Sequence, residues 1–120
     1  MTNLEIYNIA NNLLEAFNDN NQKLPVKVNF FFQKNKKTLL NLAQEIEEER
    51  INIAQNHGNL DPETGNYSVS AEHIEAAQQD LNNLFNIEQD VNIAKINYND
   101  LDPNMELTTA QMEALMFMIE

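Results

Sequence analysis

The feature that most constrains the fold is a long run of apolar residues at helical spacing in the middle of the chain. These residues recur every three or four positions, or at multiples of that spacing, and are Leu39, Leu42, Ala43, Ile46, Ile53 and Ala54. Such spacing places them on one side of an α-helix. Asn35 can cap the start of this helix, and Gly58 stands where a left-handed residue commonly ends one. The pattern predicts a helix of about six turns, the longest in the chain.

Three further segments have the pattern of helices. Thr2 and Glu5 have the form of a capping box, and the apolar residues after them predict a helix to about residue 18. Ser70 can cap another helix that continues to about residue 85. Thr108 and Gln111 form a second capping box in front of an apolar C-terminal helix.

Two segments instead alternate between apolar and polar residues, which is typical of strands. In residues 24–32 the apolar residues share one parity, and they are Leu24, Val26, Val28, Phe30 and Phe32. Residues 89–98 change parity near Ile93, so we expect a β-bulge there. The chain is therefore predicted to be one α+β domain over residues 1–120, with four helices and a two-stranded antiparallel sheet in the order α-β-α-α-β-α. Two strands form a marginal sheet, which a second copy of the chain could extend.

Charge is distributed unevenly along the chain, whose formal net charge is −12. Residues 1–37 hold five lysines against three acids, whereas residues 38–120 hold two basic residues against sixteen acids. A surface this negative repels nucleic-acid phosphates and anionic lipids, so we expect no direct binding to nucleic acid or membrane. The chain has no cysteine, which excludes disulfides and thiolate chemistry. It has no apolar run near the roughly 20 residues of a membrane span and no leader pattern, so an intracellular location is expected.

The acidic stretch from Glu45 to Gly58 invites a metal or acid/base interpretation, which its spacing does not support. Neither His57 nor His73 has a glutamate three residues before it, as di-iron helix bundles require. A His-Glu-x-x-His pair is absent as well. Glu47 can pair with Arg50 on the helix surface. We therefore expect a solvated helix face and no catalytic residues.

Residues Asp61, Glu63, Gly65 and Glu72 have part of the spacing of a calcium-binding loop. The glycine of such a loop belongs at position 6, where this chain has Asn66, and position 5 should offer an oxygen ligand. The segment is better interpreted as a turn. We expect no metal, no cofactor and no enzymatic activity.

Three groups of residues are candidates for binding. The acidic candidates for a basic partner are Glu45, Glu47, Glu48, Glu49, Asp80, Glu88 and Asp90. The candidates for a small nucleotide-type anion are Lys34, Lys36 and Lys37, which are expected at a helix N-terminus near Tyr7, Phe31 or Tyr98. The candidates for a homo-oligomer interface are Met112, Leu115, Met116, Phe117, Met118 and Ile119. An ordinary core helix is the alternative interpretation of this last group.

The order of these segments, from LPVKVNFFFQKNKKTL through EIEEERINIA to LTTAQMEALMFMIE, resembles small proteins of unknown function encoded by phages and prophages of low-GC Gram-positive bacteria. The resemblance is one of pattern over nearly the whole chain and carries no catalytic signature. It implies a non-catalytic binding protein in the host bacterial cytoplasm. An inhibitor or adaptor would engage a basic host or anti-phage defence protein through the acidic surface. The alternatives are a virion head or tail assembly protein, or a sponge for a small nucleotide-type ligand.

Overall fold

The structure is a computed structural model that describes residues 1–17, 24–60, 64, 67–69, 71–102 and 104–120. Its elements are α1 (Asn3–Ala16), α2 (Val26–His57), β1 (Gly58–Leu60), β2 (Tyr67–Val69), α3 (Ile74–Phe85), the 3-10 turn η1 (Tyr98–Asp100), α4 (Thr109–Leu115) and the 3-10 turn η2 (Met116–Met118). Within the described ranges, no helix is both long and apolar enough to cross a bilayer.

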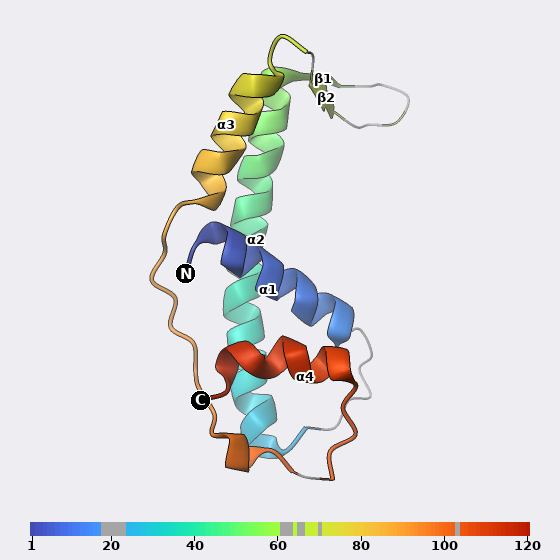
Figure 1. Ribbon diagram of the computed structural model, residues 1–120, viewed down its shortest axis with the longest axis vertical. Helices are drawn as coiled ribbons and strands as arrows, with labels where there is room; N and C mark the ends of the chain where they lie inside the picture. The colour runs from blue at the N-terminus through green and yellow to red at the C-terminus, as the bar shows by residue number, and fades with distance from the viewer. Residues whose placement is uncertain (18–23, 61–63, 65–66, 70, 103) are drawn as a thin grey trace.

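The long helix α2 organises the molecule (Figure 1). Helices α1 and α4 cross the same side of its N-terminal half, and α3 lies beside its C-terminal half. The shape is elongated, with extents of 55, 32 and 20 Å. The shortest extent corresponds to two layers of helix, each about 10 Å across. We call α1, α4, η2 and residues 26–42 the body, and α3 with residues 43–57 the arm.

A single buried stripe explains why α2 is one continuous helix of 32 residues. Its buried residues are Val28, Phe32, Asn35, Leu39, Ile46 and Ile53, spaced by three, four or seven positions. The sequence has no glycine or proline between Pro25 and Gly58 to interrupt it. Pro25 occupies the N-cap, where its missing N–H has no helical partner to lose.

The prediction of a strand over residues 24–32 is therefore wrong. Val28 and Phe32 are buried one helical turn apart, whereas Val26 and Phe30 share their parity but face solvent. The cap predicted at Asn35 is also wrong, because Asn35 lies inside α2, which begins at Val26.

The prediction of an α+β fold is likewise wrong, since the described structure is helical with four α-helices. In the segment predicted as a strand over residues 89–98, residues 89–97 are extended (Figure 1) but form no strand of a sheet, residue 98 begins η1, and the bulge expected near Ile93 is not formed. Their one bridge joins Ile96 to Ile119 in parallel. Apart from isolated bridges, strand pairing in the described ranges is the three-residue ladder of β1 and β2, with Gly58 opposite Val69. Gly58 is extended at φ −130°, so the left-handed stop predicted for it is wrong as well.

The capping boxes predicted at both ends of the chain are confirmed. Thr2 accepts from the backbone N–H of Glu5, and the Glu5 carboxylate accepts from the backbone of Thr2. That backbone bond and the Thr2 hydroxyl hold the pKa of Glu5 below its usual range. Thr108 and Gln111 make the equivalent box at the start of α4. Helix α3 begins at Ile74, and the cap predicted at residue 70 lies outside the described residues.

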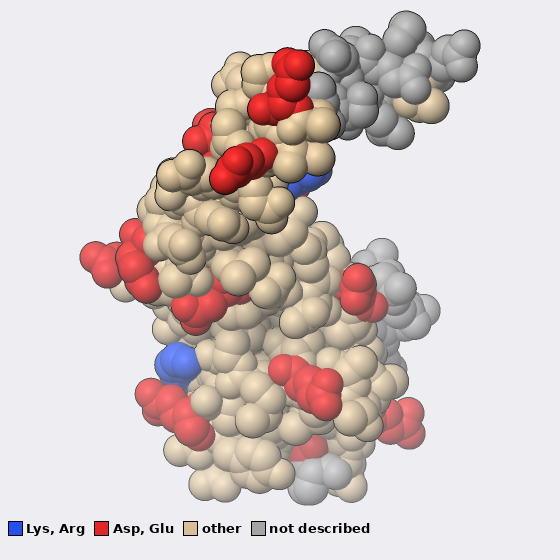
Figure 2. All heavy atoms as spheres, turned by 45° about the horizontal axis from the view of Figure 1, so that its top comes forward, with Lys and Arg blue, Asp and Glu red and all other residues tan. Residues whose placement is uncertain are grey.

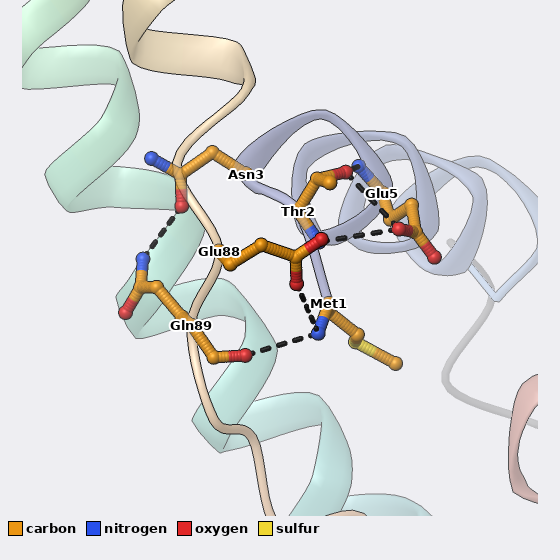
Figure 3. A network of polar contacts seen from close by, with 6 residues as sticks. All are labelled: Met1, Thr2, Asn3, Glu5, Glu88 and Gln89. Atoms are coloured by element: carbon orange, nitrogen blue, oxygen red, sulfur yellow. Dashed lines mark hydrogen bonds and ion pairs between the residues drawn. The ribbon is translucent and has the colours of Figure 1, made fainter.

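The start of the chain is attached to the segment that follows α3 (Figure 3). The Met1 amino group donates to the Gln89 carbonyl at 3.0 Å and lies 3.5 Å from the Glu88 carboxylate. The Gln89 side chain donates to the Asn3 side-chain oxygen at 2.6 Å, and Asn3 donates to the Leu84 carbonyl at 2.9 Å. This network links α1 to the base of the arm.

Candidate protein-interaction face on the long helix

One side of α2 is exposed along its full length, opposite the buried stripe. We call it the outer face. Its residues are Val26, Phe30, Gln33, Lys37, Asn41, Gln44, Glu48, Ile51 and Gln55. They recur every three or four positions, so they form one straight band on the helix surface. All nine are exposed.

Apolar side chains lie toward both ends of the outer face. Val26 is 88% exposed and Phe30 64% exposed in the body, and Ile51 is 38% exposed in the arm. Isolated exposed apolar residues are ordinary, but here they lie on a single band with polar residues between them. The band can therefore contact another helix over several turns.

The charges of α2 are separated by sign along its length. Lysines 27, 34, 36 and 37 belong to its N-terminal half, which has no acid. The C-terminal half has four glutamates at 45 and 47–49 and only Arg50 as a base, before His57 at its end. Like charges three or four residues apart destabilise a helix by tenths of a kcal/mol, so this distribution does not help α2 to form.

The predicted pair between Glu47 and Arg50 is confirmed. The Arg50 Nε donates to Glu47 Oε2 at 2.9 Å, and the same oxygen accepts from the Tyr7 hydroxyl at 2.9 Å. Hydrogen bonds from Arg50, and then from Tyr7, lower the pKa of Glu47. The same pair raises the pKa of Arg50. Glu47 therefore links α1 to α2 and is not free for a partner.

The other acidic candidates do not form one patch. Asp80 lies 2.7 Å from His57 Nε2 across the arm, and Glu88 contacts the Met1 amino group. Asp90 is exposed on the extended segment. Figure 2 shows acidic side chains in separate groups over the face in view, with uncharged atoms between them.

Glu45, Glu48 and Glu49 remain as a local acidic group on α2. All three are exposed, and none takes part in an ion pair within the described residues. Glu49 accepts a long 3.4 Å bond from Asn52. The acidic part of the candidate site is therefore reduced to Glu45, Glu48 and Glu49.

The predicted lysine group is not at a helix N-terminus, because α2 begins at Val26. Lys34 and Lys37 are exposed, and Lys36 lies 6.0 Å from the centre of the Phe32 ring. The N-terminal backbone groups expected to bind an anion are therefore not beside this group. Ion pairs within the described residues use none of these three lysines.

None of these lysines lines either of two surface cavities of the described structure. The first, of about 220 Å³, lies between α1 and α4 and is lined by Asn12, Glu15, Ala16, Ala110, Glu113 and Ala114. The second, of about 240 Å³, is lined by Tyr98, Leu101, Asp102, Met105, Leu107 and Met112. Sites for drug-sized ligands usually measure about 300–1,000 Å³. Both cavities are smaller than that.

The residues predicted as an oligomer interface belong mainly to the core of the body. Leu115 and Met118 are fully buried, while Phe117 and Ile119 are half-buried against the core. Met116 is the exposed member of the group, and half-buried Met112 lines the second cavity. The C-terminal helix thus fits the alternative interpretation as a core helix.

The described residues contain no group of three side chains suited to hold a metal ion. Asp61, Glu63 and Gly65, from the calcium-like stretch, lie outside the described residues. Glu72, its last member, is exposed.

A polar contact that was not predicted from the sequence fixes the extended segment to α2. Buried Asn35 donates to the Ala94 carbonyl at 2.9 Å and accepts from the Ala94 N–H at 2.8 Å. The Asn35 side chain therefore satisfies both backbone groups of Ala94, as the backbone of a neighbouring strand would. The sequence feature that could have indicated this contact is the position of Asn35 between Phe32 and Leu39 in the apolar stripe, where an apolar residue is expected.

Comparison with protein-family models, curated proteins and solved structures finds no match to this chain. The resemblance to phage-encoded proteins therefore stays a prediction.

Proposed function

We propose that this protein is a non-catalytic protein-binding module and that the outer face of α2 is its binding surface. The observation that carries the proposal is a helix of 32 residues with one side exposed from end to end. Amphipathic partners commonly recognise such a helix through residues spaced three, four and seven apart. We thus propose that the inhibitor or adaptor in the host cytoplasm, which the resemblance implies, binds its partner through the outer face.

The acidic part of the outer face defines the chemistry of the partner. Glu48 lies on the band, and Glu45 lies along its edge one turn away. Both are exposed and lack ion pairs in the described structure, so they can meet a lysine-rich or arginine-rich surface. Ile51 supplies an apolar contact beside them. Charges of this kind steer association and select partners more than they add affinity.

A protein partner fits the geometry better than a small ligand. The two cavities described above are small, and the lysines expected to bind a nucleotide line neither of them.

The probe is a synthetic helical peptide with one lysine-rich face. Isothermal titration calorimetry measures its binding to the protein at low and at high salt. Glu45→Lys/Glu48→Lys should weaken binding by at least about tenfold at low salt, because it places like charges across the contact. The control Glu15→Lys/Glu113→Lys makes the same change of net charge at exposed positions of the body. It should change binding by less than about threefold. Equal losses in both variants would mean that net charge alone attracts the probe, which contradicts a site on α2.

A further inference from the structure

We propose that the partner of the outer face is a second copy of this chain, whose α2 packs antiparallel about a two-fold axis near Asn41. This inference rests on the proposed function, and it identifies the basic surface to which Glu45 and Glu48 bind. The occupant follows from charge complementarity, because the N-terminal half of the same face carries Lys37, with Lys34 along its edge, and no acidic residue.

The midpoint of α2 lies next to Asn41, since the helix runs from Val26 to His57. Lys37 and Glu45 lie about one turn from that point, on opposite sides of it. Lys34 and Glu48 lie about two turns from it, again on opposite sides. A two-fold axis at the midpoint therefore brings both lysines of each copy close to both glutamates of the other.

The edges of the band also agree with this arrangement. Lys34 and Glu45 flank the outer face on the same edge of α2. A two-fold axis perpendicular to two facing antiparallel helices brings the same edge of each copy together. Lys34 and Glu45 are therefore on the edge where they can pair between copies.

The apolar residues follow the same symmetry. Phe30 and Ile51 each lie about three turns from the midpoint, so Phe30 of each copy comes near Ile51 of the other. Asn41 and Gln44 lie at the centre, where polar side chains can hydrogen-bond across the axis. Two-fold interfaces of this kind are self-complementary and close at two subunits.

A parallel arrangement of the same faces is disfavoured. It would place Lys34 and Lys37 against the same lysines, and Glu45 and Glu48 against the same glutamates, with a cost from like charges. Within one copy these charges gain no ion pair among the described residues. Antiparallel pairing places each of these four residues near a residue of opposite charge in the other copy.

The test is a charge-reversal and mixing experiment read by light scattering at low salt, with circular dichroism to confirm retained helix. The unaltered chain should have the mass of a dimer that dissociates as salt rises. Lys34→Glu/Lys37→Glu and Glu45→Lys/Glu48→Lys should each be monomeric, because each places like charges in both halves of the interface. An equimolar mixture of the two should form a dimer, since every contact between unlike copies is then attractive. The control Glu15→Lys/Glu113→Lys should remain a dimer.

Other outcomes overturn the inference. An unaltered chain that is monomeric over the whole concentration range contradicts self-pairing. Reversed variants that remain dimeric, or a mixture that stays monomeric, contradict the antiparallel contact. If the unaltered chain is monomeric but still binds the lysine-rich peptide through Glu45 and Glu48, the proposed function stands and only the identity of the partner fails. If peptide binding also does not depend on these two residues, the proposed function fails too.

Discussion

The body and the arm share the helix α2 but surround it differently. In the body, α1 and α4 cover one side of the helix, and Leu39 is fully buried together with Leu13 and Leu115. In the arm, α3 is the helix beside α2, and the buried residues Ile53 and Leu84 keep 7% and 8% of their surface exposed. A closed core thus gives way to a contact between two helices.

This difference teaches how a chain of 120 residues maintains an elongated shape. Two helices alone bury less apolar surface than three, so the arm depends on polar contacts with the body. Those contacts include the bond of Met1 to the segment after α3, the bond of Asn3 to Leu84 in α3, and the bond from Tyr7 to Glu47. The outer face stays exposed in both regions, which leaves it available for association.

The largest expected effect comes from matched truncations in the two regions. Leu39→Ala should lower the free energy of unfolding by roughly 4 kcal/mol, and Leu84→Ala by roughly 2 kcal/mol. The first leaves a cavity in a closed core, whereas the second lies where neighbours and solvent can fill part of the space. Urea denaturation of both variants measures the difference. Equal losses would break the distinction between body and arm.

A smaller effect is expected at the contact between α2 and the extended segment. Asn35→Ala should cost about 2 kcal/mol, because it leaves the N–H and C=O of Ala94 without their partner in a buried site. Asn56→Ala, at an exposed position of the same helix, should change stability by less than about 0.5 kcal/mol. Thermal unfolding of the two variants compares them. Equal melting temperatures would show that the Ala94 contact contributes little to folding.

The smallest effect concerns Glu47 at the junction of the two regions. Its pKa is lowered in the folded state by Arg50 and Tyr7, so its contribution to stability is present above the unfolded pKa of about 4.3. It is lost as the pH falls through the lower folded value. Because the pair is partly exposed, Glu47→Gln should cost only about 0.5 kcal/mol at neutral pH. Urea titrations over a series of pH values should show the gap in stability between the two proteins narrowing as the pH falls below the unfolded pKa, and a constant gap would contradict this role.

The sequence was most informative where local chemistry decides the structure. The capping boxes at Thr2 and Thr108 need only residues three apart, and the Glu47–Arg50 pair needs only one helical turn. All three were predicted correctly for that reason.

The errors arose where tertiary packing decides. The apolar residues of 24–32 alternate as in a strand, but of Val26, Val28, Phe30 and Phe32 only Val28 and Phe32 are buried. They lie one helical turn apart, so the segment belongs to α2, which begins after Pro25. The absence of glycine and proline between Pro25 and Gly58 was the sequence feature that indicated a longer helix. The acidic candidates separated for a similar reason, because Asp80 and Glu88 found partners far along the chain.

The measurement that tests the central claim most directly is the distance between copies of α2. The chain has no cysteine, so Asn41→Cys and Gln55→Cys each offer one site for a nitroxide spin label. Pulsed electron resonance should give a short distance between labels at position 41. At position 55 it should give about 40 Å, because each label then lies about 20 Å from the two-fold axis. Equal short distances at both positions would indicate parallel pairing, and the absence of any distance between copies would contradict self-association through the outer face.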